Sequence, residues 1–125
     1  MRYTLGMDDP LSPFCPRFHH AIELVGRRWT GAILRAMFAG SVRFSDIAET
    51  VPGLSDRLLS ERLKELEAEG LVTRSCLQSP MRVEYRLTEQ GRALAPAIQA
   101  LAEWAEAWLP VQSAAQRQPE PAPAS

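Results

Sequence analysis

Several features are scarce or absent in this 125-residue chain, and their absence excludes whole classes of protein. No apolar run approaches the roughly 20 residues that a membrane-spanning helix needs. The first ten residues, MRYTLGMDDP, lack the apolar core of a secretory signal. We therefore expect a cytoplasmic protein that contacts no membrane. Its two cysteines should be reduced there, unless they serve a redox purpose.

Lysine is almost missing as well, since Lys64 is the only one, and the formal net charge is −1. A negative chain is a poor match for phosphate groups. However, residues 27–92 hold eleven basic and nine acidic side chains, so the negative surplus lies in the flanks. The basic groups of this segment are nearly all arginine, whose planar fork suits bidentate contacts to phosphate and guanine. The charge pattern therefore permits nucleic-acid binding without establishing it.

Patterns that carry enzyme chemistry are also missing. The chain has no glycine-rich phosphate loop, and no Ser/His/Asp set or carboxylate pair has a spacing that rises above chance. We expect no enzyme and no cofactor. Cys15 and His19 would share one face of a helix, but two ligands are too few for a closed zinc site, so no metal is expected.

The most informative pattern lies between residues 43 and 88, where short helical segments are followed at once by a hairpin. The chain predicts a helix, a tight turn, a second helix and two strands, over 45–51, 52–54, 55–70, 71–77 and 83–88. This order is typical of a winged helix-turn-helix. That fold places its second helix in the major groove of DNA.

Further helices are predicted on both sides of this motif, which gives an α+β, mostly α fold with additional N- and C-terminal helices. They run from Pro16 to Gly26, from Trp29 to Ala39, and from Thr88 to Leu109, the last with a kink or break near Pro96. One domain should span 15–110. Residues 1–14 are expected to form a flexible arm, and the proline-rich residues 111–125 a disordered tail.

The second helix of the motif has two distinct faces on a helical wheel. Its apolar face, which should pack into the core, consists of Leu59, Leu63 and Leu66. Ser55 is placed to cap the helix. On the outer face, Arg57 and Ser60 are candidates for base contact, and Lys64 for phosphate or the groove wall. The competing interpretation is a merely solvated amphipathic surface helix.

Three further arginines are candidates for contact with DNA. Arg82 is expected at the tip of the hairpin loop, facing a minor groove or phosphate ridge, although it could simply solubilise that loop. Arg43, beside the first turn, and Arg28, with its neighbour Arg27, are phosphate candidates. Within the hairpin, we expect Cys76 to point inward as a small core residue and Glu84 to point outward.

Together these segments resemble the HxlR-type family of bacterial winged-helix transcriptional regulators, which are related to the MarR group. The matching pieces cover about residues 15–109 and are CP (15–16), GRRW (26–29), RFSDI (43–47), PGLSDRLLSERLKELEAEGLV (52–72), RVEYRLTEQG (82–91) and LAEWAEAW (101–108). The resemblance implies a homodimer, built by the first and last helices, that binds an operator near its own or a neighbouring gene. The His19-His20 pair has no counterpart in that pattern.

The apolar residues of the first and last helices exceed what one small domain can cover. The expected dimer-interface residues are Phe18, Ile22, Leu94, Ile98, Leu101, Trp104 and Trp108. A second interpretation stays open, in which the aromatic residues Phe18, Trp29, Trp104 and Trp108 line a ligand pocket between subunits.

Cys15 directly precedes a predicted helix, whose positive N-terminal end stabilises a thiolate. Several members of the resembled family use an N-terminal cysteine as a sensor, which implies a redox-sensing role for Cys15. The alternative is a structural cysteine at the dimer interface.

We therefore predict a sequence-specific DNA-binding transcriptional regulator, a repressor, that binds a pseudo-palindromic double-stranded DNA operator as a homodimer. Its effector would be an oxidant, an electrophile or another small molecule. The alternative function is a winged-helix module for protein–protein assembly. The outward Arg57, Ser60 and Lys64 favour DNA, because an assembly helix should expose apolar residues there.

Overall fold

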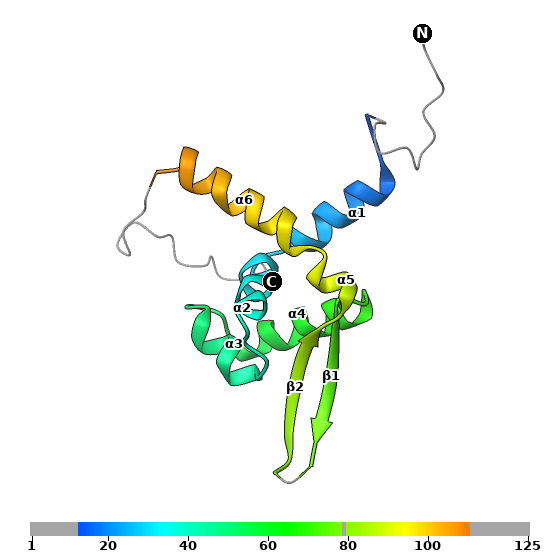
Figure 1. Ribbon diagram of the computed structural model, residues 1–125, viewed down its shortest axis with the longest axis vertical. Helices are drawn as coiled ribbons and strands as arrows, with labels where there is room; N and C mark the ends of the chain where they lie inside the picture. The colour runs from blue at the N-terminus through cyan, green and yellow to red at the C-terminus, as the bar shows by residue number, and fades with distance from the viewer. Residues whose placement is uncertain (1–12, 79, 111–125) are drawn as a thin grey trace.

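The computed structural model describes residues 13–78 and 80–110, and within them it shows helices and one antiparallel hairpin (Figure 1). The elements are α1 (Pro16–Val25), α2 (Thr30–Phe38), α3 (Phe44–Thr50), α4 (Asp56–Ala68), β1 (Val72–Leu77), β2 (Arg82–Leu87), α5 (Glu89–Arg92) and α6 (Ala95–Trp108). The predicted winged helix-turn-helix with additional terminal helices is confirmed. The expected arm lies outside the described residues except for Pro13 and Phe14, and the expected tail lies wholly outside them.

Local capping explains where the helices begin and end. Ser55 Oγ accepts a hydrogen bond from Leu58 N–H at 3.1 Å, and Thr88 Oγ1 accepts one from Gly91 N–H at 3.0 Å. The predicted C-terminal helix is divided between α5 and α6, with Pro96 in the first turn of α6, where a missing N–H costs nothing. The break expected near this proline is therefore confirmed.

The core lies where α4 crosses α2 and α3. Ile33 and Leu34 of α2 are fully buried, as is Ile47 of α3. The three leucines predicted for the inner face of α4 are also buried: Leu59, Leu63 and Leu66. Each such side chain contributes roughly 1.5–3 kcal/mol on leaving water. This packing fixes which face of α4 remains outside.

The turn of the helix-turn-helix is held by two residues with positive φ. Gly53 has φ +85°, a conformation that favours glycine, and a Cβ there would lie 3.4 Å from the Trp29 ring. Trp29, just before α2, has φ +77° and is the only described non-glycine residue with positive φ. The bulky indole therefore packs against the turn from a strained backbone.

The hairpin corrects two sequence-based predictions. Arg74 and Cys76 lie on the same face of β1 as Val72, but the hairpin extends beyond the helices, so Val72 is buried while Cys76 is exposed (Figure 1). Glu84, expected to face outward, is only 7% exposed. The segment before α3 pairs with β2 at this point: Arg43 forms an isolated β-bridge with Glu84, and Tyr85 N–H donates to Val42 O at 2.7 Å.

Among the described residues, no helix is both long enough and apolar enough to cross a membrane.

Candidate nucleic-acid interface

The outer face of α4 is polar and accessible. The side chain of Arg57 is 81% exposed, with only a loose ion pair of 3.9 Å to Glu61 on the next turn. Lys64 is exposed and Ser60 is half-buried. Ser55 is exposed at the helix start, where its hydroxyl oxygen serves as the cap. The structure thus brings the four predicted residues of this segment onto one accessible stretch of helix.

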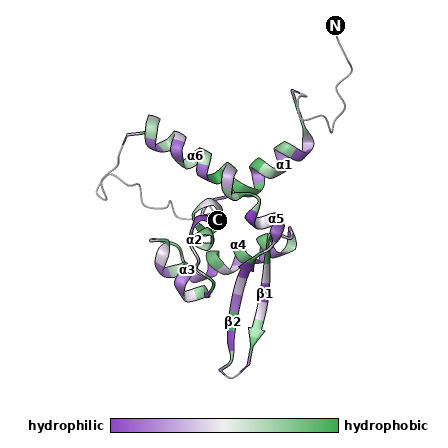
Figure 2. Cartoon of the chain, in the orientation of Figure 1, coloured by the Kyte–Doolittle hydropathy of each residue, from purple (hydrophilic) through white to green (hydrophobic). Residues whose placement is uncertain are grey.

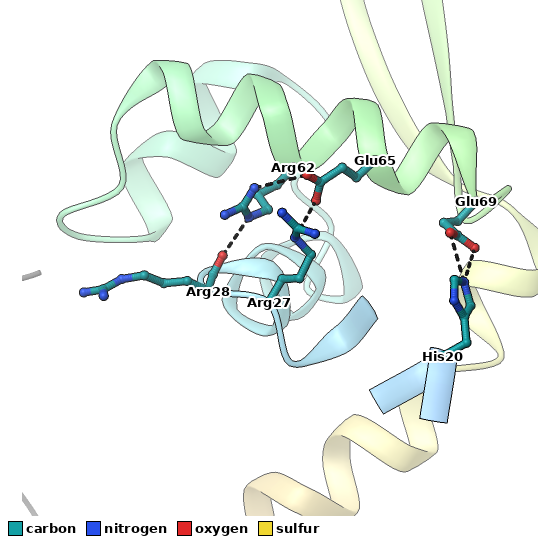
Figure 3. Close-up of polar contacts among 6 residues, drawn as sticks. All are labelled: His20, Arg27, Arg28, Arg62, Glu65 and Glu69. Carbon is teal, nitrogen blue, oxygen red and sulfur yellow. Dashed lines mark hydrogen bonds and ion pairs between the residues drawn. The ribbon is translucent and has the colours of Figure 1, made fainter. Parts of the chain in front are cut away.

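The inner polar side of α4 contains a residue that the sequence patterns did not single out. The side chain of Arg62 is 12% exposed, and its Nε donates to the carbonyl oxygen of Arg28 at 2.9 Å (Figure 3). Its other donor, Nη1, lies 3.3 Å from Glu65 Oε2. A largely buried guanidinium that links two elements in this way orients α4. The i, i+3 spacing of Arg62 and Glu65 was the only sequence signal for it.

Arg27 and Arg28, considered together as phosphate candidates, have different surroundings. Arg27 Nε lies 3.2 Å from Glu65 Oε1, so this side chain is directed toward α4 (Figure 3). Arg28 extends away from that contact, with its guanidinium carbon 5.7 Å from the centre of the Trp29 ring. Of the two, only Arg28 stays a phosphate candidate.

In the hairpin, a buried carboxylate holds two arginines. Glu84 Oε2 accepts a hydrogen bond from Arg82 Nε at 3.0 Å, and Oε1 accepts one from Arg86 Nη2 at 2.6 Å. These two hydrogen bonds, first that of Arg82, lower the pKa of Glu84. Arg82 was expected at the loop tip. It is instead the first residue of β2, with a 35% exposed side chain directed back to Glu84.

Arg43 completes the basic surface beside the hairpin. It is exposed, precedes α3 and pairs through its backbone with Glu84. Arg82 and Arg86 of the wing thus share one buried carboxylate, and the exposed Arg43 lies on the segment that pairs with β2. The side chain of Arg86 is 60% exposed.

At the other end of the molecule, α1 and α6 diverge from the body (Figure 1), and both helices contain apolar residues, coloured green in Figure 2. The exposed members of the predicted interface set are Phe18, Ile22, Leu101, Trp104 and Trp108, with fractions between 49% and 74%. Ile98, by contrast, is only 8% exposed, and Leu94 packs against the core of its own chain. These two residues pack within their own protomer. The candidate dimer interface therefore consists of the five exposed side chains.

Cys15 caps the N-terminal end of this apolar region. It is half-buried, and its Sγ accepts a long hydrogen bond of 3.5 Å from Phe18 N–H. Across the described residues, no three His, Cys, Asp or Glu side chains are grouped as metal ligands would be. His20, next to the candidate ligand His19, is directed toward Glu69.

Sequence comparison decides the family. The family model described as "HxlR-like helix-turn-helix" matches residues 24–113. The chain belongs to this HxlR-like family. It is 46% identical over 99 residues to the uncharacterized HTH-type transcriptional regulator YvaP of Bacillus subtilis, covering 78% of this chain and 92% of YvaP. It is 43% identical over 93 residues to the HTH-type transcriptional regulator YodB of the same species, covering 74% of this chain and 83% of YodB.

Solved structures agree with this assignment. The reduced form of YodB from B. subtilis superposes with a TM-score of 0.70 at 40% identity, covering 80% of this chain and 99% of that one. The quinone-bound form of YodB superposes with a TM-score of 0.66 at 41% identity, covering 76% of this chain and 100% of that one. The redox regulator HypR in its reduced form superposes with a TM-score of 0.67 at 36% identity, covering 73% of this chain and 91% of that one.

As an HxlR-like protein, the chain is a DNA-binding transcriptional regulator, and its relatives are regulators and not enzymes. Within that fold α4 is the recognition helix and the β1–β2 hairpin is the wing.

Proposed function

We propose that this regulator is a cytoplasmic repressor that binds a pseudo-palindromic operator as a homodimer. The observation that carries the proposal is the division of the surface. Cationic and polar side chains occupy the outer face of α4 and the wing, while apolar side chains are exposed on α1 and α6. One surface suits phosphate and base edges, and the other suits a second copy of the chain.

The base-reading role belongs to the N-terminal half of α4. Arg57 and Ser60 would meet base edges in the major groove, with Ser55 and Lys64 on either side contacting the backbone. Arg28, Arg43 and Arg82 would contact phosphates. In a dimer, two such helices reach successive major grooves about 34 Å apart. We assign repression because the compact described domain has no evident surface for recruiting polymerase.

The effector would act at Cys15. YodB, a similar protein, has been solved in diamide-treated and quinone-bound forms, and HypR in reduced and oxidized forms. Cys15 lies where α1 begins, three residues from Phe18 on the candidate interface. Oxidation or alkylation of this thiol would move α1 and so change the separation of the two recognition helices. Even a small change would break the match to groove spacing.

The test begins with selection of the operator from random double-stranded DNA by the full-length protein. Two inverted half-sites whose centres lie one helical turn, or a multiple of it, apart are the expected result, together with dimers in sedimentation. Enrichment of no sequence, or of a single asymmetric half-site bound by monomers, would contradict the proposal. The first of these results would favour the assembly module in its place.

A further inference from the structure

Polar side chains at the C-terminal part of α4 lie against α1 and the turn that follows α1 (Figure 3). Glu69 is the residue that ends α4, and both of its carboxylate oxygens lie 3.0 Å from His20 Nε2 of α1. Because a carboxylate only accepts, Nε2 is the donor in this contact. One turn earlier on α4, Glu65 Oε1 lies 3.2 Å from Arg27 Nε.

The same side of α4 carries a third link, in which Arg62 binds the backbone. Its Nε donates to the carbonyl oxygen of Arg28 while Nη1 contacts Glu65 Oε2, so one guanidinium joins α4 to the segment before α2. The side chain of Arg62 is largely buried and Glu65 is about one-third exposed. Glu65 Oε1 is buried and has Arg27 as an ion-pair neighbour, though without hydrogen-bond geometry.

These contacts matter because α1 has little else to fix its direction. None of its ten residues is buried, and only Leu24 and Val25 at its C-terminal end pack against the core. On a helix, His20 lies two positions from both Phe18 and Ile22, which places it on roughly the opposite side. One face of α1 thus carries exposed apolar residues, and the other carries the link to the recognition helix.

We propose that Glu65 and Glu69 are positioning residues that fix the recognition helix relative to α1, with His20 as the titratable partner. This inference rests on the proposed function, in which α1 contacts the second subunit. The contacts then form a continuous path from the dimer interface to the C-terminal part of α4. Each broken contact would broaden the range of angles between α1 and α4, and an operator of fixed half-site spacing selects only one of them, so operator affinity falls.

The electrostatic surroundings of His20 give this link a pH dependence. The hydrogen bond that His20 donates to Glu69, and then the charge of Glu69, raise the pKa of His20 above its ordinary value of 6.5, and Glu23 adds to the effect. The charged groups around it come from three segments: Arg17 and Glu23 on α1, Arg27 on the following turn, and Glu65 and Glu69 on α4 and its end. Since the pKa is raised, the charged contact is complete below pH 6.5. It is lost as pH rises through the raised pKa.

The decisive experiment measures operator affinity from about pH 5.5 to 8.5 at fixed ionic strength for the wild type and His20→Gln. The matched control is His19→Gln, since His19 is adjacent but contacts Glu23 of its own helix, at 3.5 Å, and the Phe14 ring, and neither partner belongs to α4. Wild type and His19→Gln should lose about two- to five-fold more affinity than His20→Gln as pH rises, the range expected of an exposed ion pair. Parallel profiles in all three proteins, or a wild-type affinity that rises with pH relative to His20→Gln, would overturn the proposal.

A second measurement needs no DNA. The His20 imidazole is titrated by NMR in the free protein, and Glu69→Gln is expected to return its pKa toward 6.5 while leaving His19 unchanged. A His20 titration unaffected by Glu69→Gln would also overturn the proposal. Failure of the wild type to bind any DNA would instead reject the proposed function, so the two failures are distinguishable.

The role of Glu65 is tested by half-site spacing. Operators with one base pair inserted or removed between half-sites should be rejected by the wild type and tolerated better by Glu65→Gln, because a dimer in which α4 is held less rigidly relative to α1 adapts to the wrong spacing. Simple destabilisation would lower affinity for all spacings by the same factor, and that result would contradict a positioning role.

Discussion

At the scale of single residues, Glu84 couples the stability of the wing to pH. It is nearly buried, and its pKa is lowered by hydrogen bonds from Arg82 and then Arg86. A group whose folded pKa is depressed stabilises the fold above its unfolded pKa, and that contribution disappears as pH falls through the folded value. Glu84→Gln should therefore be less stable than wild type at pH 7, and the difference should shrink below the ordinary pKa of 4.5.

Urea unfolding at pH 7 and at pH 3 measures this difference. Glu49→Gln, an exposed carboxylate on α3 for which the described residues show no ion pair, is the control and should show a much smaller difference at both values. A Glu84→Gln deficit that persists unchanged at pH 3 would point to a packing effect and not to charge.

Substitution of Arg57 and substitution of Arg82 should affect DNA binding in different ways. Arg57 is exposed on the reading face of α4, so Arg57→Ala should reduce discrimination between operator and scrambled DNA by about 1–3 kcal/mol, the value of a good bidentate base contact. Arg82→Ala should weaken binding to both DNAs alike and reduce the salt slope by about 1. Fluorescence anisotropy at several salt concentrations separates these effects. Undiminished discrimination by Arg57→Ala would move the base contacts elsewhere.

Cys15 is predicted to be the effector site, and the exposed Cys76 provides the control. Serine is a better N-cap than cysteine, so Cys15→Ser should keep α1 intact while removing the thiol. Wild type and Cys76→Ser should lose operator binding after diamide or quinone, and Cys15→Ser should retain it. Because Cys76 is exposed, it also reacts with such reagents. If Cys76→Ser were the protected variant, the sensor would be in the wing.

At the scale of elements, sequence periodicity predicted the helices, the turn and the hairpin, because burial of one helix face leaves a readable pattern. The leucines of α4 are the clearest case. The errors at Cys76 and Glu84 have a different cause. Strand alternation gives the face of a residue, but it does not give how far the core extends along the hairpin or whether a neighbouring segment pairs with the strand.

The polar contacts between α4 and the α1 region could not be predicted from the sequence, for a related reason. His20 and Glu69 are 49 positions apart, and their contact depends on the angle at which α1 leaves the body. No local pattern encodes that angle. Arg27 likewise seemed a phosphate candidate until the structure placed Glu65 beside it.

Two glycines test the backbone of the helix-turn-helix. Gly53→Ala forces a side chain into φ +85° in the turn and should destabilise the fold by about 1–2 kcal/mol. Gly31→Ala is the matched control. Gly31 lies inside α2, where a Cβ meets no atom closer than 4.0 Å, so alanine should stabilise by about 0.5–1 kcal/mol. Thermal and urea unfolding measure both, and equal shifts would show that the turn carries no such constraint.

At the scale of the whole molecule, the exposed aromatic residues predict how the chain assembles. Trp104 and Trp108 are 53% and 74% exposed on α6, which leaves the body on the side opposite the wing (Figure 1). A charge placed among such residues opposes burial in a dimer while costing the protomer little. Trp104→Glu should therefore sediment as a 13.9 kDa monomer at micromolar concentration and should keep its helical content.

The same variant should bind an isolated half-site as the wild-type protomer does but lose the added affinity for two half-sites, since linkage through the dimer supplies it. Glu106→Ala removes an exposed polar side chain from the same helix and should leave both the dimer and the operator affinity unchanged. A Trp104→Glu protein that stays dimeric would place the interface elsewhere. A wild type that is already monomeric would contradict the proposed homodimer, and with it the continuous path from a dimer interface to the recognition helix.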